Sequence, residues 1–241
     1  MEKVTKLLQD TSNRYYKLPN KKWLFYQCWE NSLLMHWAVA PDLLIKLLPN
    51  NIELDVYNHK AYMSIVLFDV TEFRSFFMNM KMPFVSDFKE INVRTYVTVN
   101  GVKGVYFFSL YADQFLAVIG ASLFYQLPYK SASILRNDEI SIVSGKGLRL
   151  QVDYEMGEVI KQPTTLDIWL TERHAFFQKR GKNIYRCDIH HPQWVLQKIK
   201  FRHQLLQLSS SANVLLPVLQ EADITHFASK LDVLFWNRVK V

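Results

Sequence analysis

The sequence predicts a mainly β protein of the α+β class, built as a large, curved antiparallel sheet or barrel with a few capping helices. Many short runs rich in Val, Ile, Tyr, Phe and Thr are separated by polar, Gly, Pro or Asn breaks. Helical spacing is confined to a few short segments. The chain has 241 residues, 49% hydrophobic and 21% charged, which suits one domain of this class.

Residues 1–22 are predicted to form a basic N-terminal extension ahead of a single domain over residues 23–241. Val4, Leu7 and Leu8 have helical spacing, and Pro19 helps to end the segment. No repeat or low-complexity linker divides the rest of the chain.

Helices are expected over 41–48, where Pro41 precedes a leucine stripe, and over 113–125. Asn100 and Gly101 predict a hairpin turn between two strong strands. The predicted strands are 23–30, 52–57, 61–68, 91–99, 105–111, 131–136, 140–144, 148–154, 165–170, 184–189, 194–201 and 233–236.

The net charge of +7 is concentrated in two segments. Residues 1–22 hold six Lys and Arg against two Asp and Glu, and residues 172–203 hold eight against two. Such segments suit either an anionic partner or a solvated basic face. No nucleic-acid-binding motif accompanies them, so we expect no nucleic-acid partner.

Two cysteines far apart, Cys28 and Cys187, predict no disulfide framework. No secretory signal precedes the domain, and the longest near-apolar run, 115–125, is shorter than the roughly 20 residues that cross a bilayer. We expect a cytoplasmic protein without a membrane partner. Its oligomeric state stays open, with a homo-oligomer as one option.

The strand around residues 90–97 carries the most informative side chains. Glu90, Asn92, Arg94 and Tyr96 share one face by alternation, and apolar residues share the other. In an open antiparallel sheet the polar face meets solvent, whereas in a closed sheet it lines an interior. Glu90 and Arg94 stand about 13 Å apart along the strand, so they can line one cavity without pairing.

Tyr129 and Lys130 follow Pro128 at the start of a predicted strand. A lysine among aromatic side chains in a cavity forms a Schiff base with a carbonyl substrate once its pKa is depressed. The alternative is a surface lysine whose stem rests on an aromatic ring.

Adjacent histidines His190 and His191, close to Cys187 and Asp188, invite a metal interpretation. Neighbouring strand residues face opposite sides, and no HxxxH or HExxH motif is present. We therefore expect no metal site, and we expect a histidine here to be packed in the core or at a pocket mouth. No P-loop, GxGxxG or GxSxG motif points to a nucleotide or a hydrolase.

The chain resembles an uncharacterised bacterial family, the YqjF-like proteins of the acetoacetate decarboxylase-like superfamily. The resemblance covers about residues 23–237 and rests on pieces that keep their order. These are Gln27-x-Trp29, His36-Trp37, the Pro41 to Asp55 segment, the Glu90 to Val97 strand, Gly104 to Leu110, Leu127-Pro128-Tyr129, Leu170 to Arg173, and His190-His191-Pro192-x-Trp194.

The resemblance implies a curved antiparallel sheet that closes into a cone-like barrel around a central small-molecule cavity. Acetoacetate decarboxylases use a lysine Schiff base, a second lysine directly after it, and a nearby glutamate. Here Tyr129 stands at the nucleophile's position, Lys130 matches the second lysine, and Glu90 matches the glutamate. Because Tyr129 replaces the nucleophile, true decarboxylase activity is in doubt.

We therefore expect a protein that binds, and if it is an enzyme transforms, a small carbonyl- or carboxylate-bearing metabolite without a cofactor. The catalytic candidates are Glu90, Tyr129 and Lys130. The ligand-binding candidates are Arg94, Tyr96, Arg173 and His191. The alternative is a non-catalytic module whose basic segments bind an anionic partner.

Overall fold

The computed structural model describes residues 2–76, 87–114, 127–208 and 221–241. Its described helices are α1 (Glu2–Gln9), α2 (Pro41–Ile45) and α4 (Thr165–Thr171). Its strands are β1 (Phe25–Val39), β2 (Glu53–Leu54), β3 (Ala61–Ser75), β4 (Phe88–Val99), β5 (Val102–Ala112), β6 (Tyr129–Arg136), β7 (Ile140–Gly145), β8 (Leu148–Val159), β9 (Ala175–Arg180), β10 (Asn183–His190), β11 (Gln197–Leu208), β12 (Ile224–Phe235) and β13 (Val239–Lys240).

All these strands belong to one sheet that closes on itself twice. The first ring runs through β1, β3, β4, β5, β9, β10 and β12, and the β10–β12 pairing closes it. The second ring runs from β5 through β6, β7, β8 and β11 to β12, and returns through β1, β3 and β4. The predicted mainly β, curved and closed sheet is confirmed.

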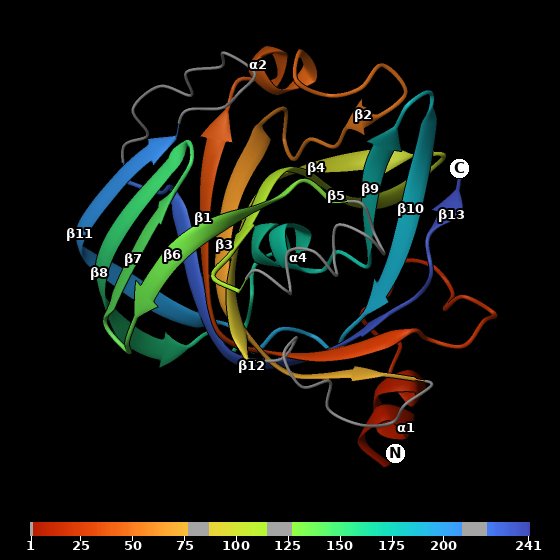
Figure 1. Ribbon diagram of the computed structural model, residues 1–241, viewed down its shortest axis with the longest axis horizontal. Helices are drawn as coiled ribbons and strands as arrows, with labels where there is room; N and C mark the ends of the chain where they lie inside the picture. Colours follow the sequence, from red (N-terminus) through yellow and green to blue (C-terminus); the bar gives the residue numbers. More distant parts are fainter. Residues whose placement is uncertain (1, 77–86, 115–126, 209–220) are drawn as a thin grey trace.

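Each ring encloses its own hydrophobic core, and Figure 1 shows α4 within the first ring. Trp169 and Leu170 of α4 belong to the first core together with Tyr96 of β4. Ile91 and Val93, on the other face of β4, belong to the second core. The two faces of β4 therefore both look into an interior, which explains why nearly the whole strand is buried.

The predicted hairpin between β4 and β5 is confirmed. Asn100 and Gly101 form a two-residue turn with φ of 50° and 76°, the left-handed region that a type I′ turn requires. Three residues after the turn, β5 passes close to β9, with which it pairs in parallel. A Cβ atom on Gly104 would lie 2.5 Å from the carbonyl oxygen of Ala175 and 2.8 Å from the ring of Phe177.

We expect Gly104→Ala to lower the free energy of unfolding by about 1–3 kcal/mol, because the added methyl group forces β5 and β9 apart. Gly157→Ala is the matched control, since its nearest neighbour would lie at 3.3 Å. Urea unfolding of both variants measures the difference. Equal stabilities would contradict the close packing of β5 on β9.

The strand predicted over 165–170 is wrong, because these residues form α4. Thr164 caps this helix: its Oγ1 accepts a hydrogen bond from the Asp167 backbone N–H, and the Asp167 carboxylate accepts from the Thr164 backbone N–H. This reciprocal capping box outweighs the strand preference of the Ile, Trp and Thr side chains that follow.

Other predicted elements differ mainly in length. The 52–57 strand shrinks to β2, the 194–201 strand begins only at Gln197, and the 233–236 strand is the end of the much longer β12. The predicted helix over 41–48 is confirmed in its first part as α2. The helix predicted over 113–125 lies outside the described residues from position 115 onward.

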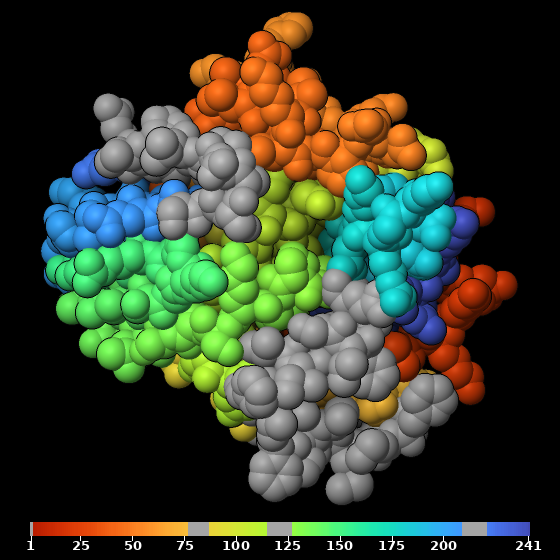
Figure 2. Space-filling model, turned by 45° about the horizontal axis from the view of Figure 1, so that its top comes forward, coloured from red at the N-terminus to blue at the C-terminus, as the bar shows by residue number. Residues whose placement is uncertain are grey.

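The N-terminal segment packs onto the first ring rather than trailing away from it. Its predicted helix is confirmed as α1, whose Leu7 is buried with Tyr26, Cys28 and Trp236. Figure 2 shows this segment, in red, beside the C-terminal residues in blue. None of the described helices has the length and apolar character needed to cross a membrane.

Candidate functional site

A row of polar side chains on β4 is buried inside the first ring. Glu90, Asn92, Arg94 and Tyr96 are 6%, 3%, 7% and 0% exposed. The predicted alternation is confirmed, and the solvent-facing alternative is excluded. Four polar residues in a row on a buried strand face are costly to a fold unless they pair with one another or with a ligand.

Glu90 pairs with Tyr129, the first residue of β6. The Tyr129 hydroxyl donates a hydrogen bond of 2.5 Å to Glu90 Oε2. Burial raises the pKa of Glu90 to about 7, although hydrogen bonds from Tyr129 and Asn92 act in the opposite direction. A carboxyl group with a pKa near neutrality can both release and accept a proton under ordinary conditions.

Arg94 is buried without a partner for much of its guanidinium. Its Nε and Nη2 atoms have no hydrogen-bond acceptor within the described parts of the chain. The Oδ1 atom of the neighbouring Asn92 likewise has no hydrogen-bond donor there. The Arg94 guanidinium carbon lies 6.0 Å from the centre of the Tyr96 ring. Arginine keeps its charge in proteins, so among the described residues this buried cation is uncompensated and two of its nitrogen donors are unpaired.

A chain of hydrogen bonds runs from α4 across the ring to Tyr96. Asp167 Oδ1 lies 2.9 Å from His226 Nε2, and His226 Nδ1 lies 3.4 Å from His36 Nε2. His36 Nδ1 lies 2.7 Å from Ser64 Oγ, which in turn lies 2.7 Å from the Tyr96 hydroxyl. Apart from Tyr96, these residues were not candidates from sequence, because only the register brings them together.

The pKa shifts of His36, His226 and Asp167 determine where the protons of this hydrogen-bond chain lie. Burial lowers the pKa of His36 well below its ordinary value, and burial also lowers that of His226, although Asp167 partly offsets it. Burial would raise the pKa of Asp167, but hydrogen bonds from Thr164 and His226 leave it lowered. Both imidazoles are therefore neutral, and His226 donates from Nε2 to the Asp167 carboxylate.

Lys130 does not join this site. Its Nζ lies 5.3 Å from the centre of the Tyr111 ring, and Tyr111 belongs to the core of the second ring. The parallel pairing of β5 with β6 places Lys130 opposite Tyr111 and Tyr129 opposite Leu110, a residue of the first core. Consecutive strand residues face opposite sides, so Tyr129 and Lys130 point into different interiors.

Arg173 also lies in the first ring, but its charge is neutralised there. Its Nη1 donates to Asp55 Oδ2 at 2.6 Å, and its Nε donates to the Trp169 carbonyl. The guanidinium lies over the rings of Trp169 and Tyr96, at 4.3 and 4.8 Å. These contacts fasten α4 to the ring. Arg173 Nη2 also has no acceptor in the described structure, but the charge of Arg173 is paired with Asp55, whereas no ion pair is formed by Arg94 among the described residues.

His191 lies away from the polar row. It stacks on His174 with ring centres 4.4 Å apart, and its described contacts include none with Glu90, Arg94 or Tyr129. Burial lowers its pKa to about 4, so the imidazole is neutral. Its neighbour Glu172 comes within 4.0 Å.

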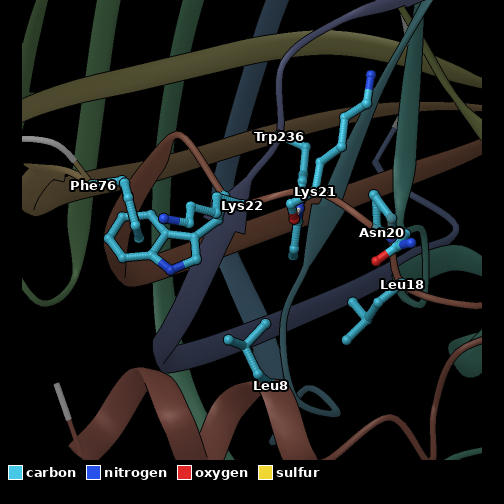
Figure 3. A pocket seen from close by; sticks show the side chains of 9 residues that line it. Leu8, Leu18, Asn20, Lys21, Lys22, Phe76 and Trp236 are labelled. Carbon is cyan, nitrogen blue, oxygen red and sulfur yellow. Dashed lines mark hydrogen bonds between the residues drawn. The ribbon is translucent and has the colours of Figure 1, made fainter.

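Two surface pockets are lined by described residues, and neither contains Glu90 or Arg94. A pocket of about 520 Å³ lies between α1 and Trp236, where Lys22 stands 5.0 Å from the Phe76 ring (Figure 3). A second pocket, of about 380 Å³, opens between Asn31, Arg136 and Phe227. The central cavity expected from the family resemblance stays a prediction.

The two basic segments are partly neutralised by the chain itself. Ion pairs join Lys3 to Asp232, Lys6 to Glu2, Arg173 to Asp55, Arg186 to Asp188, Lys198 to Glu158, and Arg202 to both Glu139 and Asp153. They therefore offer an anionic partner less free charge than their composition indicates.

Comparison with known structures supports the fold assignment. An acetoacetate decarboxylase-like enzyme from Sphingomonas wittichii RW1 superposes with a TM-score of 0.61 at 13% identity, over 92% of this chain and 94% of the other. The acetoacetate decarboxylase of Legionella pneumophila gives 0.61 at 13% identity, over 98% and 95%. The enduracididine biosynthesis enzyme MppR, complexed with pyruvate, gives 0.61 at 11% identity, over 94% and 93%. The chain has the acetoacetate decarboxylase-like fold.

Sequence comparison identifies a more similar relative and a family. The uncharacterized protein YqjF of Bacillus subtilis (strain 168) is 36% identical over 229 residues, which are 91% of this chain and 93% of YqjF. Residues 26–232 match the family described as an uncharacterized conserved protein, DUF2071. The chain therefore belongs to the DUF2071 family of uncharacterized conserved proteins.

Proposed function

We propose that this protein binds a small 2-keto acid inside the first ring, with the carboxylate of the ligand at Arg94 and its carbonyl end toward Glu90 and Tyr129. Glu90 then exchanges a proton with the bound ligand. The observation that carries the proposal is the buried Arg94 guanidinium, whose Nε and Nη2 lack acceptors in the described chain.

A carboxylate supplies what Arg94 lacks. Its two oxygens accept a pair of parallel N–H donors from one guanidinium, and its charge compensates the buried cation. Asn92 stands between Arg94 and Glu90 on the same strand face. The backbones of Glu90 and Arg94 are about 13 Å apart, so their extended side chains reach a small ligand from its two ends.

Glu90 and Tyr129 form the acid–base pair of the proposed site. At neutral pH Glu90 is divided between its two protonation states, since its pKa is raised to about 7. The Tyr129 hydroxyl holds one carboxylate oxygen at 2.5 Å. Asn92 also hydrogen-bonds the carboxylate, and in the proposed complex the carboxylate faces C3 of the ligand, the carbon next to the ketone, whose proton it takes. Lys130 takes no part, which favours proton transfer over Schiff-base chemistry at this site.

The neighbour MppR supports the choice of ligand class, because its structure is described as a complex with pyruvate. It shares the fold at 11% identity, so the support extends to the type of compound and not to individual residues.

Pyruvate is the first probe, and its neutral amide, pyruvamide, is the matched control. Isothermal titration calorimetry is expected to show one pyruvate per chain and at least about tenfold weaker binding of pyruvamide, because the amide cannot satisfy a charged arginine. Equal affinities for the two compounds, or no pyruvate binding at millimolar concentration, would exclude a carboxylate site at Arg94.

Proton transfer is tested separately from binding. In D₂O the methyl protons of pyruvate exchange through its enol, and ¹H NMR follows their loss. A working base at Glu90 is expected to speed this exchange by about 10²-fold or more relative to Glu90→Gln, with pyruvate affinity little changed. Identical exchange rates in the unaltered chain and in Glu90→Gln would contradict a role of Glu90 as a base, and only the binding part of the proposal would remain.

A further inference from the structure

Apart from the polar row, a second cluster of ionisable side chains is buried where α4, β9 and β10 meet. Glu172 follows α4, His174 precedes β9 and His191 follows β10, and their side chains are 3%, 0% and 1% exposed. Glu172 Oε2 lies 3.8 Å from His174 Nε2 and 4.0 Å from His191 Nδ1. One ligand atom from each residue lies within 4.8 Å of the others.

The Glu172 carboxylate has no lysine or arginine partner among the described residues. Its oxygens accept hydrogen bonds from neutral donors, the Asn13 amide at 2.6 Å and the Trp194 backbone N–H at 3.1 Å. The nearby Arg14 forms no ion pair with Glu172 among the described residues: its Nη1 donates to the Ile189 carbonyl at 2.7 Å, and its Nη2 is buried without a partner. A buried carboxylate without a counter-ion is unfavourable, so the cluster favours an added cation.

Several polar atoms around the cluster have no suitable partner. His174 Nδ1 and Asn13 Oδ1 are buried without a hydrogen bond, while His174 Nε2, which lies 3.8 Å from Glu172 Oε2, faces the Asn13 carbonyl oxygen at 3.2 Å. Both ring nitrogens of His191 face carbonyl oxygens, those of Pro192 and Arg173. A neutral imidazole carries only one N–H, so one of these nitrogens directs a lone pair at an acceptor. Lone pairs without donors are what a metal ion satisfies.

We propose that Glu172, His174 and His191 bind one divalent transition-metal ion of the zinc type, with Asn13 turning its amide oxygen toward it. Two imidazoles and a carboxylate are a ligand set that such ions favour. Bonds of about 2.0–2.1 Å in a tetrahedral site separate ligand atoms by about 3.4 Å. The observed 3.8 and 4.0 Å therefore need shifts of about half an ångström. One of the stacked rings must also rotate so that the two lone pairs converge.

The metal would have a structural role, since its fourth ligand comes from the N-terminal segment. Asn13 belongs to the stretch that crosses the ends of β9 and β10, and Arg14 holds the same stretch through the Ile189 carbonyl. A bound ion would join this segment to the ring. The cluster shares no contact with Glu90 or Arg94 in the described structure, so this proposal stands independently of the proposed keto-acid site.

Untagged protein, stripped with a chelator and dialysed, is titrated with Zn²⁺ by calorimetry and with Co²⁺ by visible absorption. We expect one ion per chain, a Co²⁺ spectrum typical of four N and O ligands, and a higher melting temperature with Zn²⁺. Asn13→Ala removes the neutral fourth ligand, whose place a water molecule can take, and is expected to weaken Zn²⁺ binding by about 10-fold, with larger losses for Glu172→Gln and His174→Leu. His203→Ala, at an exposed histidine, is the control and leaves binding unchanged.

The proposal is overturned if the stripped protein binds no ion at equimolar metal, or if Glu172→Gln and His174→Leu bind as tightly as the unaltered chain. Circular dichroism checks that each variant is folded. If the buried variants do not fold, X-ray absorption of the Zn²⁺-loaded unaltered protein decides the matter. Scattering from two imidazoles supports the site, and its absence excludes it.

Discussion

Arg94→Met is expected to weaken pyruvate binding by about 100-fold while leaving the fold as stable as before or more stable. Loss of the charged, bidentate hydrogen bonds costs roughly 3 kcal/mol of binding free energy, or about 100-fold in Kd. The Met side chain follows the same path as the arginine stem and removes a buried charge whose Nε and Nη2 have no acceptor in the described chain. Removal of such a charge typically raises the free energy of unfolding, here by about 1–3 kcal/mol.

The combination of weaker binding and undiminished stability distinguishes a ligand site from a structural arginine. Calorimetry with pyruvate and urea unfolding measure the two quantities on the same variant. Arg202→Met is the matched control, because Arg202 is exposed and paired with Glu139 and Asp153. A strongly destabilised Arg94→Met variant would show that Arg94 supports the fold, and the site would then need another anchor.

The second large effect concerns the pH dependence of stability. The pKa of Glu90 rises from an ordinary 4.5 to about 7 in the folded chain, chiefly because the side chain is buried. The native state therefore holds this proton more tightly than the unfolded chain does. The stability that Glu90 contributes is fully present below about pH 4.5 and is lost as the pH rises through about 7.

Glu90→Gln removes this dependence, since glutamine is neutral at every pH and still accepts the Tyr129 hydrogen bond. Relative to the unaltered chain, the variant is expected to gain roughly 3 kcal/mol in unfolding free energy between pH 4 and pH 8. Urea denaturation at several pH values measures it, with the exposed Glu155→Gln as the control. If the two stability curves stay parallel across this range, Glu90 is ionised at neutral pH in the native state.

Much of the fold could be predicted because it depends on local signals. The turn at Asn100 and Gly101, the helix begun by Pro41 and the alternation along β4 all follow from residue type and spacing. The strand prediction for residues 165–170 was wrong because Ile, Trp and Thr are typical of strands, whereas Thr164 and Asp167 together cap a helix. A threonine three residues before an acidic residue was the overlooked signal.

The candidate site was only half predictable for a different reason. Alternation identified Glu90, Arg94 and Tyr96, since all three lie on one strand. His36, Ser64 and His226 join them through the register of β1 with β3 and β12, which a single sequence does not specify. The cluster of Glu172, His174 and His191 likewise depends on how β9 pairs with β10 and where α4 ends. Of the adjacent histidines only His191 belongs to this cluster, in keeping with strand alternation, and Glu172 and His174 come from other parts of the chain.

The central claim is that a carboxylate pairs with Arg94 inside the first ring. The most direct test follows the side-chain Nε–Hε resonance of Arg94 by ¹⁵N NMR during a pyruvate titration, with Arg94→Met identifying the signal. The resonance is predicted to shift and to saturate at one pyruvate per chain, with the Kd obtained by calorimetry. Pyruvate binding that leaves this resonance unmoved would contradict the claim.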